Sequence, residues 1–534
     1  MLVFLSVNVM AQGVSFNLQD TLRGSITPER AWWDLTYYYL DIEIDPDQKT
    51  IKGSNRINYR VIESNNVIQI DLQSPLKITQ VVQNGKELNF QSKGNAHFIR
   101  LSEQQPVGSF QELTVMYEGK PHEAIRAPWD GGITWSKDKA GQPFIASSCQ
   151  GIGASIWWPC KDHMYDEPDS MTIKVEVPKD LMAVANGRLK NVKRNKRKKT
   201  RTFEWFVSSP IANYTVNVNV GDYTHFDESY DGEKGKLDMD YYVLKENLER
   251  AKAQFKDARR TMEALEHWFG PYPFYEDGYK LVEVPYLGME HQSSVTYGND
   301  YQNGYRGTDL SDTGWGLKFD FIIVHESGHE WFANNITYSD IADMWIHESF
   351  TNYSESLFLE YHYGKEAGRS YVRGTRERIA NDKPIIGTYG VNSRGSSDMY
   401  YKGGNILNTL RSMIDDDDKW RMILRGLNEK FYHKVVDTKD IEDYISEHSE
   451  MDLSSFFDQY LRDARVPALE YFFKGGQLHY RWVNCIESFN MPVDLVLNNE
   501  KVRVNATAQW NTRKAEETSI QIDENYYVYS FKVR

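Results

Sequence analysis

The chain has 534 residues, which is long enough for several domains, each with its own core. It carries 62 Lys and Arg against 76 Asp and Glu, a formal net charge of −14, and 40% of its residues are hydrophobic. This acidic balance disfavours nucleic acid as a primary partner, because a polyanion requires a basic footprint. The three cysteines (Cys149, Cys160 and Cys485) are too few for a disulfide framework, and their spacing does not suggest a cysteine-based zinc site.

The N-terminus predicts a secretory signal. Residues 2–11, LVFLSVNVMA, form an apolar run that ends in Val-Met-Ala before Gln12. The first positive charge is Arg23, so the basic segment that usually begins a signal is missing. We therefore expect the start of the chain to be truncated. We therefore expect 1–11 to be a signal segment of a secreted or periplasmic protein. The alternative is a disordered apolar terminus of a cytoplasmic protein. No other run approaches the 18 or so apolar residues of a membrane helix.

The first long region, from about Asp34 to Tyr223, is strand-like. Its segments are short, rich in β-branched and aromatic residues, and divided by Gly, Asn, Asp and Pro turns. They read YYYLDIEIDP, NRINYRVIE, NVIQIDLQ, ELTVMYEG, MTIKVEV, RTFEWFVSS and YTVNVNVGDY. The basic run KNVKRNKRKKTR, at 190–201, lies between two of these signals, so we expect a hairpin turn there rather than a polyanion patch.

A helical pattern begins at Asn247. Apolar residues recur close to helical spacing through NLERAKAQFKDARRTMEALEHWFG, until Gly270 and Pro271 stop the run. Helical segments are expected to dominate to about Leu461, and DDDD at 415–418 is expected to cap or solvate a helix end rather than to bind metal. Alternation returns after Pro467 in LEYFFKG, QLHYRWV, VDLVLNN, VRVNATAQW and YYVYSFKV, which predicts a small β-sandwich.

The segment VHESGHEWFANN, at 324–335, contains candidate metal ligands and a candidate catalytic base. Residues i and i+4 share one face of a helix, so His325 and His329 can present two imidazoles to one zinc ion. Glu326 flanks the metal and can take a proton from water bound there. The alternative is a helix on which two histidines occur by coincidence, and on the order of 0.02 such matches are expected by chance in this chain.

A third ligand should follow, leaving one metal position for water. Glu348 in IADMWIHESF is separated from His329 by eighteen residues, and a turn followed by a second antiparallel helix would return it to the site. Glu355 lies seven residues further, two turns along the same face, where it can hydrogen-bond a ligating histidine. The alternative for Glu355 is a solvated helix carboxylate.

With these residues, the block HESGHEWFANNITYSDIADMWIHESFTNY resembles the gluzincin aminopeptidases of the aminopeptidase N type. That family also contains the leukotriene-forming epoxide hydrolase/aminopeptidases. YLGMEHQ, at 286–292, resembles the family's Gly-x-Met-Glu-Asn exopeptidase motif. CQGIGASIWWPCKDHMYDEPD, YYKGGNIL and FFDQYLRDARVPALEY resemble other family segments, so the resemblance covers nearly the whole mature chain.

The resemblance implies a role for each matching residue. His325, His329 and Glu348 match the zinc ligands, for one ion per chain, and Glu326 matches the general base. Tyr400 matches the tyrosine that stabilises the oxyanion, with a core or rim tyrosine as the alternative. The remaining matches concern substrate binding: Glu290 holds the α-ammonium, Gln150 lines the amino-terminal subsite, and Gly288 and Met289 provide backbone contacts. The alternatives are an ion pair of Glu290 with a basic neighbour and a structural hydrogen bond of Gln150 to a loop.

The chain also departs from the family pattern. Leu287 and His291 replace the first Gly and the Asn of the exopeptidase motif, which affects the substrate pocket but not the carboxylate. Glu330 follows the second zinc histidine, where Gln is usual. Gly395 stands five residues before Tyr400, where the epoxide hydrolases carry a second tyrosine, and this argues against leukotriene chemistry. The family's helical solenoid is missing after the β-sandwich.

We therefore predict a multidomain α+β protein. Its expected parts are an N-terminal saddle-like β domain (12–225), a thermolysin-like, mainly helical catalytic domain (226–465) and a C-terminal β-sandwich (466–534). The expected function is a zinc aminopeptidase acting on peptides with a free N-terminus, with no nucleic-acid partner, no membrane span and an oligomeric state left open. The alternatives are a zinc endopeptidase and a catalytically inactive binding scaffold of the same fold.

Overall fold

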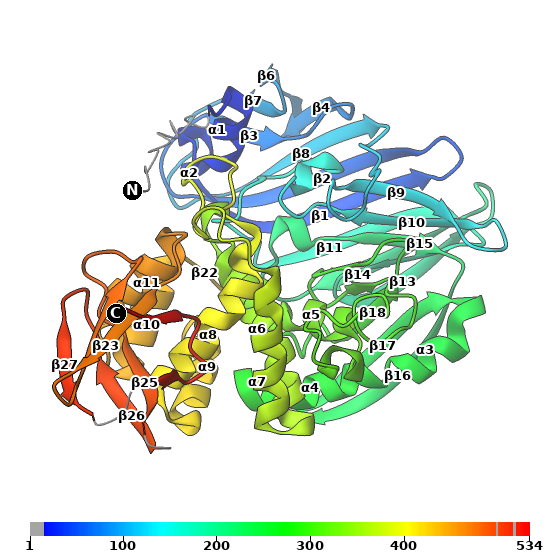
Figure 1. Ribbon diagram of the computed structural model, residues 1–534. Helices are drawn as coiled ribbons and strands as arrows, with labels where there is room; N and C mark the ends of the chain where they lie inside the picture. Colours follow the sequence, from blue (N-terminus) through cyan, green and yellow to red (C-terminus); the bar gives the residue numbers. More distant parts are fainter. Residues whose placement is uncertain (1–14, 498–499, 516–518, 534) are drawn as a thin grey trace, which may run out of the picture.

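The N-terminal part of the computed structural model is built from β-strands (Figure 1). The structure describes residues 15–497, 500–515 and 519–533, so the expected signal segment 1–11 lies outside the described residues. The largest sheet has eight strands in the order β13-β14-β11-β1-β2-β8-β4-β5. These strands are β1 (Trp33–Asp45), β2 (Thr50–Val61), β4 (Lys77–Gln83), β5 (Lys86–Glu87), β8 (Phe110–Gly119), β11 (Ser170–Pro178), β13 (Arg188–Asn195) and β14 (Thr200–Val207).

Two smaller sheets complete this part, and two short helices, α1 (Leu18–Gly24) and α2 (Pro28–Ala31), precede β1. One sheet contains β3 (Val67–Asp71), β7 (Ala96–Arg100) and β6 (Phe90–Lys93). The other contains β12 (Met182–Ala185), β15 (Val218–Gly221), β10 (Pro143–Ser148) and β9 (Gly132–Lys137). In β1 buried and less buried residues largely alternate, as expected for a strand with one face on a core. The predicted β domain is confirmed, and the basic run lies on the β13–β14 hairpin.

The middle part joins a five-stranded sheet to a group of helices (Figure 1). The sheet has the order β16-β17-β18-β20-β19, with β16 (Tyr223–Gly232), β17 (Gly235–Leu244), β18 (Tyr279–Glu283), β20 (Val295–Tyr297) and β19 (Gly288–Met289). The helices are α3 (Leu248–Gln254), α4 (Lys256–Phe269), α5 (Phe321–Gly328), α6 (Trp345–Tyr363), α7 (Lys365–Gly374), α8 (Tyr401–Ile414), α9 (Asp417–Lys430), α10 (Thr438–Ser449) and α11 (Ser454–Arg462). The short strands β21 (Ile336–Tyr338) and β22 (Lys434–Val436) pair in parallel.

This part is predicted as mainly helical, and the prediction does not include its sheet. The single helical run expected from Asn247 is two helices, α3 and α4, that meet at Phe255. The four consecutive aspartates end α8 and begin α9, as expected: Asp415 adopts the left-handed conformation after α8, and Asp416 caps α9.

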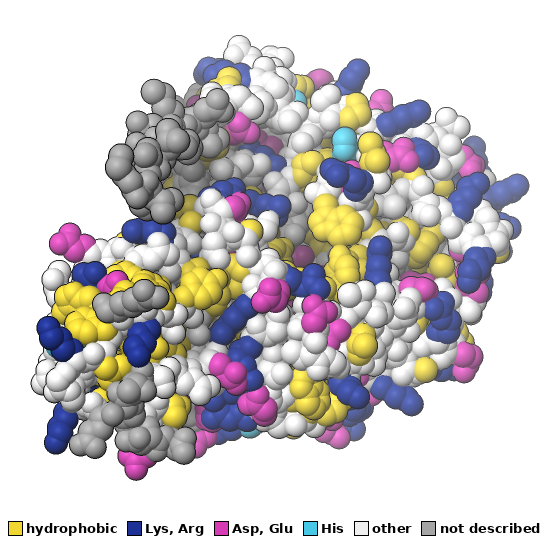
Figure 2. Space-filling view, in the orientation of Figure 1, with side chains coloured by type: hydrophobic (Ala, Val, Ile, Leu, Met, Phe, Trp, Pro, Cys, Tyr) yellow, Lys and Arg dark blue, Asp and Glu magenta, His cyan; other side chains and the backbone are white. Residues whose placement is uncertain are grey.

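The C-terminal part is the predicted β-sandwich. Its four-stranded sheet contains β27 (Asn511–Lys514), β24 (Gln477–Val483), β23 (Ala468–Lys474) and β29 (Tyr529–Lys532), and its three-stranded sheet contains β26 (Glu500–Asn505), β25 (Pro492–Leu497) and β28 (Gln521–Ile522). It shares one hydrophobic core with the helices. Hydrophobic side chains gather on its surface in Figure 2. Trp510, Tyr529 and Phe531 are exposed residues of this part. The domain limits at residues 225 and 465 stay predictions.

The N-terminal core extends into the neighbouring part of the chain. Val282, Val284, Tyr286 and Met289, on and after β18, pack with the apolar residues of the N-terminal sheets rather than with the helices. The segment that carries Glu290 is therefore held between two cores. Within the described ranges, no helix is both long and apolar enough to cross a membrane.

Helix α5, which carries the first residues of the motif His325-Glu326-x-x-His329 (HExxH), begins after a buried aspartate. The Asp320 carboxylate accepts hydrogen bonds from the backbone N–H of Ile322 at 3.1 Å and from three side chains. Those three donors are Tyr297 Oη at 2.7 Å, Asn299 Nδ2 at 2.8 Å and Gln254 Nε2 at 2.9 Å. One carboxylate thus fixes both the start of α5 and the loop before it.

Asp320→Ala should lower the free energy of unfolding by about 3 kcal/mol or more, because it removes a cap and leaves several buried donors without an acceptor. A matched control is Asp416→Ala, an exposed cap that accepts from Lys419 N at 3.0 Å, where about 1 kcal/mol is expected. Thermal unfolding followed by circular dichroism measures both. Equal shifts in Tm for the two variants would contradict the special role of Asp320.

Candidate functional site

His325 on α5 and His329, which directly follows α5, lie one turn apart and direct the same ring nitrogen toward one point. His325 Nδ1 lies 2.8 Å from Glu355 Oε1, and His329 Nδ1 lies 3.0 Å from the Phe332 carbonyl oxygen. In the neutral form of each ring, Nδ1–H donates to its oxygen and Nε2 keeps a lone pair that can bind a metal. The Phe332 carbonyl is available because the chain leaves helical geometry there, with φ −124° and ψ 82°.

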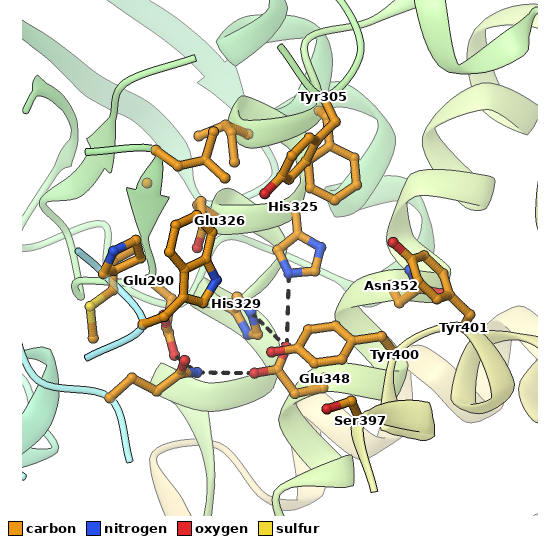
Figure 3. A pocket seen from close by; sticks show the side chains of 18 of the residues that line it. Glu290, Tyr305, His325, Glu326, His329, Glu348, Asn352, Ser397, Tyr400 and Tyr401 are labelled. Carbon is orange, nitrogen blue, oxygen red and sulfur yellow. Dashed lines mark hydrogen bonds and ion pairs between the residues drawn. The ribbon is translucent and has the colours of Figure 1, made fainter. Parts of the chain in front are cut away.

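Glu348, on the first turn of α6, faces both Nε2 atoms (Figure 3). Its Oε2 lies 3.4 Å from His329 Nε2 and 3.8 Å from His325 Nε2, and it has no hydrogen-bond partner among the residues that the structure describes. All three side chains are buried, and one ligand atom from each lies within 4.8 Å of the others. Two imidazole nitrogens and a carboxylate oxygen are a donor set suited to zinc, with a further position open.

The charges of this cluster favour a cation. Burial opposes protonation of His329, but the Glu348, Glu290 and Glu326 carboxylates outweigh burial and raise its pKa to about 10. Burial alone would raise the pKa of Glu348, yet the two imidazoles lower it to about 2. Burial raises the pKa of Glu326 to about 7. A positive charge at this point is therefore stabilised by the carboxylates around it.

A second acidic group adjoins the first. Ligand atoms of Glu290, Glu326 and His329 lie within 4.8 Å of one another. Glu290 is 3% exposed, and within the described ranges no Lys or Arg nitrogen lies within 4.0 Å of its carboxylate. Gln150 Nε2 donates to Glu290 Oε1 at 2.5 Å and to Glu348 Oε1 at 3.0 Å. Gln150 thus links the two acidic groups and does not contact a loop through this nitrogen.

Gly288 and Met289 form β19, the edge strand of the five-stranded sheet, and line the same cavity. A Cβ at Gly288 would lie 2.6 Å from Ile322 Cγ2 and 3.0 Å from the Thr296 carbonyl oxygen, so a glycine is needed for this packing. An edge strand offers its outer main-chain edge for pairing with an extended peptide.

Tyr400 precedes α8 and lies beside His325, with ring centroids 6.2 Å apart. Burial raises the pKa of Tyr400 well above its usual value, and the nearby Glu348 and Glu290 carboxylates raise it further. Gly403 allows α8 to pack closely against α6, because a Cβ at this position would lie 2.0 Å from Ser349 Oγ on α6. The Tyr-x-Lys-Gly spacing thus places Tyr400 next to the helix that carries Glu348.

The departures from the family pattern are accommodated locally. Leu287 lines the cavity, and His291 is buried, which lowers its pKa to about 3. Glu330 is fully buried, where Ser293 N donates to its Oε1 at 2.8 Å and burial raises its pKa to about 8. A Cβ at Gly395 would lie 1.7 Å from the Ile385 carbonyl oxygen, so no larger residue fits without a backbone shift.

All the predicted residues except Glu355 line one cavity of about 410 Å³. The lining also includes residues that the sequence does not single out: Trp129, Tyr305, Asn352, Arg378 and Arg394. Trp129 comes from the N-terminal domain and is 66% exposed. No motif or spacing marks these five side chains, because irregular segments carry most of them and only the fold brings them to the cavity.

Comparison with known proteins identifies two family domains. The Peptidase M1 N-terminal domain matches residues 35–214, and the Peptidase family M1 domain matches residues 254–460. A probable aminopeptidase 2 of Sulfurisphaera tokodaii is 22% identical over 75% of this chain and 50% of its own length. A leukotriene A-4 hydrolase of Xenopus laevis is 22% identical over 78% of this chain and 68% of its own length. The chain spans about half the length of most curated relatives it matches.

Solved structures show the same fold. The M1 zinc metallopeptidase of Deinococcus radiodurans, in a mutant form, superposes with a TM-score of 0.69 at 19% identity, over 82% of this chain and 96% of that one. A second structure of that mutant, bound to a Tyr-Ser-Ala substrate, gives a TM-score of 0.67 over the same shares of the two chains. The two domain matches together span most of the described residues and include the cavity with its HExxH helix, so the chain belongs to peptidase family M1.

Proposed function

We propose that the protein is a zinc aminopeptidase that hydrolyses the amino-terminal bond of peptides and holds one zinc ion per chain. The observation that carries this proposal is the Glu290 carboxylate, which is buried beside Glu326 and His329 without a described Lys or Arg partner. A buried carboxylate without a counter-ion is costly, so the site is completed by a cation from the substrate. A free α-ammonium is the cation that an unblocked peptide carries at its N-terminus.

The proposed zinc ligands are His325, His329 and Glu348. Their fit rests on two Nε2 atoms and on Glu348 Oε2, which has no hydrogen bond among the described residues, all buried at one point. Glu355 holds the His325 ring in orientation through its Nδ1–H. When bound, zinc supplies Lewis acidity, which lowers the pKa of a bound water to about 7 and polarises a carbonyl.

The chain's own side chains then divide the remaining work. The Glu326 carboxylate takes a proton from the attacking water and can return it to the leaving nitrogen. The Tyr400 O–H donates to the carbonyl oxygen, on which negative charge develops. Gly288 and Met289 align the peptide along β19. Glu290 and Gln150 hold the ammonium, so that the first peptide bond lies at Glu326.

Acetylation of the substrate's amine should slow cleavage by at least about 10²-fold. A charged ammonium on a desolvated carboxylate is worth roughly 1.5–3 kcal/mol, and an acetyl group also leaves Glu290 unpaired. The measurement compares kcat/KM for matched free and N-acetylated peptides, with mass spectrometry to locate the cleaved bond. Glu290→Ala should lower kcat/KM for free peptides and reduce the difference in kcat/KM between free and acetylated peptides.

Glu290→Gln is the matched variant, because it keeps the size and hydrogen bonding of the side chain but removes its charge. It should also narrow the gap between free and acetylated peptides. Equal cleavage of both by the wild type, at internal bonds, would identify an endopeptidase instead. Full zinc loading without any cleavage would identify an inactive binding scaffold.

We also propose a secreted or periplasmic location, which the apolar segment 2–11 supports. N-terminal sequencing of the protein from its native source tests this. Cleavage after Ala11 is expected, whereas an intact apolar segment in the cytoplasmic fraction would support the cytoplasmic alternative.

A further inference from the structure

The two basic residues that line the cavity lie on one side of it, in the segment that also carries Asp382 and Asp398. Glu290 and Gln150 lie on one side of the ligand cluster, while Tyr401 and Ser397 lie on the other (Figure 3). Arg378 and Arg394 line the cavity on the Tyr401 side: Arg378 acts electrostatically on Tyr401, and Arg394 acts on Tyr400 and precedes Ser397 by three residues. No other Lys or Arg of the described chain lines the cavity.

Both arginines are exposed and lack a carboxylate partner. Among the described residues, no Asp or Glu oxygen lies within 4.0 Å of either guanidinium. Within the described part of the chain, Arg378 donates through Nε alone, to the Leu310 carbonyl oxygen at 2.5 Å, so its two terminal nitrogens remain available. A guanidinium fork that lines a cavity without a counter-ion is suited to bind a carboxylate in two-point geometry.

The acidic residues on the same side, Asp398 and Asp382, form no described ion pair with either arginine, and both carboxylates accept local hydrogen bonds instead. Asp398 accepts from the backbone N–H of Ala380 at 2.8 Å and of Asn381 at 2.6 Å. Asp382 accepts from Ser396 Oγ at 2.5 Å. These contacts shape the segment that carries Arg378 and Arg394, and they leave the two guanidinium groups free for a ligand.

The backbone around Arg394 is fixed on both sides. Asn392 N donates to the Asp20 carbonyl oxygen at 3.0 Å, in α1 of the N-terminal domain, and Ser396 N donates to the Pro384 carbonyl oxygen at 2.9 Å. Gly395 packs directly against the Ile385 carbonyl. Arg394 therefore projects from a held loop, so part of the entropy cost of ordering it on a ligand is already met.

We propose that Arg378 and Arg394 form a carboxylate-binding subsite, which makes short peptides with a carboxylate remote from the amine the preferred substrates. The carboxylate is either the C-terminal α-carboxylate or an acidic side chain. This inference rests on the proposed aminopeptidase function, since Glu290 holds the opposite end of the peptide. A cavity of about 410 Å³ is within the size range that encloses a ligand of a few residues.

The kinetic test compares three peptides: Ala-Ala-Ala, its C-terminal amide, and Ala-Ala-Asp amide. We expect kcat/KM for the free acid to exceed that for the amide by about tenfold to a hundredfold, the range of a charge-assisted contact. In Arg394→Gln and in Arg378→Gln the ratio should fall toward one, while Arg394→Lys should keep part of it. If Ala-Ala-Asp amide regains the advantage, the subsite also takes acidic side chains. If it does not, the subsite reads the terminal carboxylate.

Lys383→Gln is the matched control, because this exposed lysine lies in the same segment but does not line the cavity. It removes one positive charge from the same surface and should leave the ratio of free acid to amide unchanged. A ratio that falls equally in Lys383→Gln and Arg394→Gln would mean that general surface charge attracts the peptide, and it would overturn the subsite.

A binding measurement separates this inference from the proposed function. In Glu326→Gln, calorimetry should give at least tenfold tighter binding of Ala-Ala-Ala than of its amide, and the difference should vanish when Arg394→Gln is added. Tighter binding of the free acid without any hydrolysis by the wild type would support the subsite and reject the aminopeptidase. Efficient hydrolysis of both peptides with equal affinity would keep the aminopeptidase and reject the subsite.

Discussion

Removal of the metal should abolish peptide cleavage, and His329→Ala should do the same by preventing metal binding. The physical reason is that three buried ligand atoms converge at one point, with Glu348 Oε2 left without a hydrogen bond. A dication binds to these three donor atoms, and its binding free energy also stabilises the folded chain. We therefore expect about one zinc per chain in the purified protein, and a lower Tm after chelation as well as in the variant.

His362→Ala is the matched control for this experiment. His362 lies on α6, as Glu348 does, but its ring bonds to the Arg260 carbonyl oxygen, 2.9 Å from Nε2, outside the cavity. This variant should keep both zinc and activity. Metal content by mass spectrometry, activity on an aminoacyl amide and Tm are measured on the same samples. A metal-free preparation that cleaves peptides at the full rate would end the zinc proposal.

The β-strands of the N-terminal domain could be predicted because each has one face on the core. In β1 and β2 apolar residues such as Leu40, Ile42 and Ile57 are buried while many of their neighbours are not, so the sequence largely alternates. Three strands in the sheet of the middle part are different. All residues of β18 and β20 are buried, and β19 has only two residues. Short strands without an exposed face leave no alternation for a sequence to display.

Some residues of the candidate site could likewise be predicted from the sequence, and others could not. The relation of His325 to His329 follows from helix geometry alone, and Glu348 is expected from its spacing on a second antiparallel helix. The role of Tyr400 follows from a family resemblance. The orientation of the His329 ring could not be predicted, because it depends on the non-helical backbone at Phe332. Arg394 could not be predicted either: it is one of many arginines in the sequence, and its loop is held by contacts to α1 and to Pro384.

Tyr400→Phe should lower kcat on the order of 10²–10³-fold and change KM much less. The variant removes one hydroxyl, and the ring beside His325 remains. A neutral O–H donor serves an oxygen most when that oxygen carries negative charge, so its loss affects the transition state more than substrate binding. The raised pKa of Tyr400, caused by burial and then by Glu348 and Glu290, keeps this hydroxyl protonated at neutral pH.

Tyr401→Phe provides the comparison, because the neighbouring ring also lines the cavity but points away from Glu348 (Figure 3). Its loss of a hydroxyl should reduce kcat far less. Steady-state kinetics on a free-amine peptide separates the two parameters, and zinc content shows that the metal site is intact in both variants. If Tyr400→Phe raises KM and leaves kcat unchanged, the hydroxyl binds the substrate in its ground state. A fall in kcat alone places the Tyr400 hydroxyl at the carbonyl oxygen as charge develops on it, because a contact made equally in both states cannot change kcat.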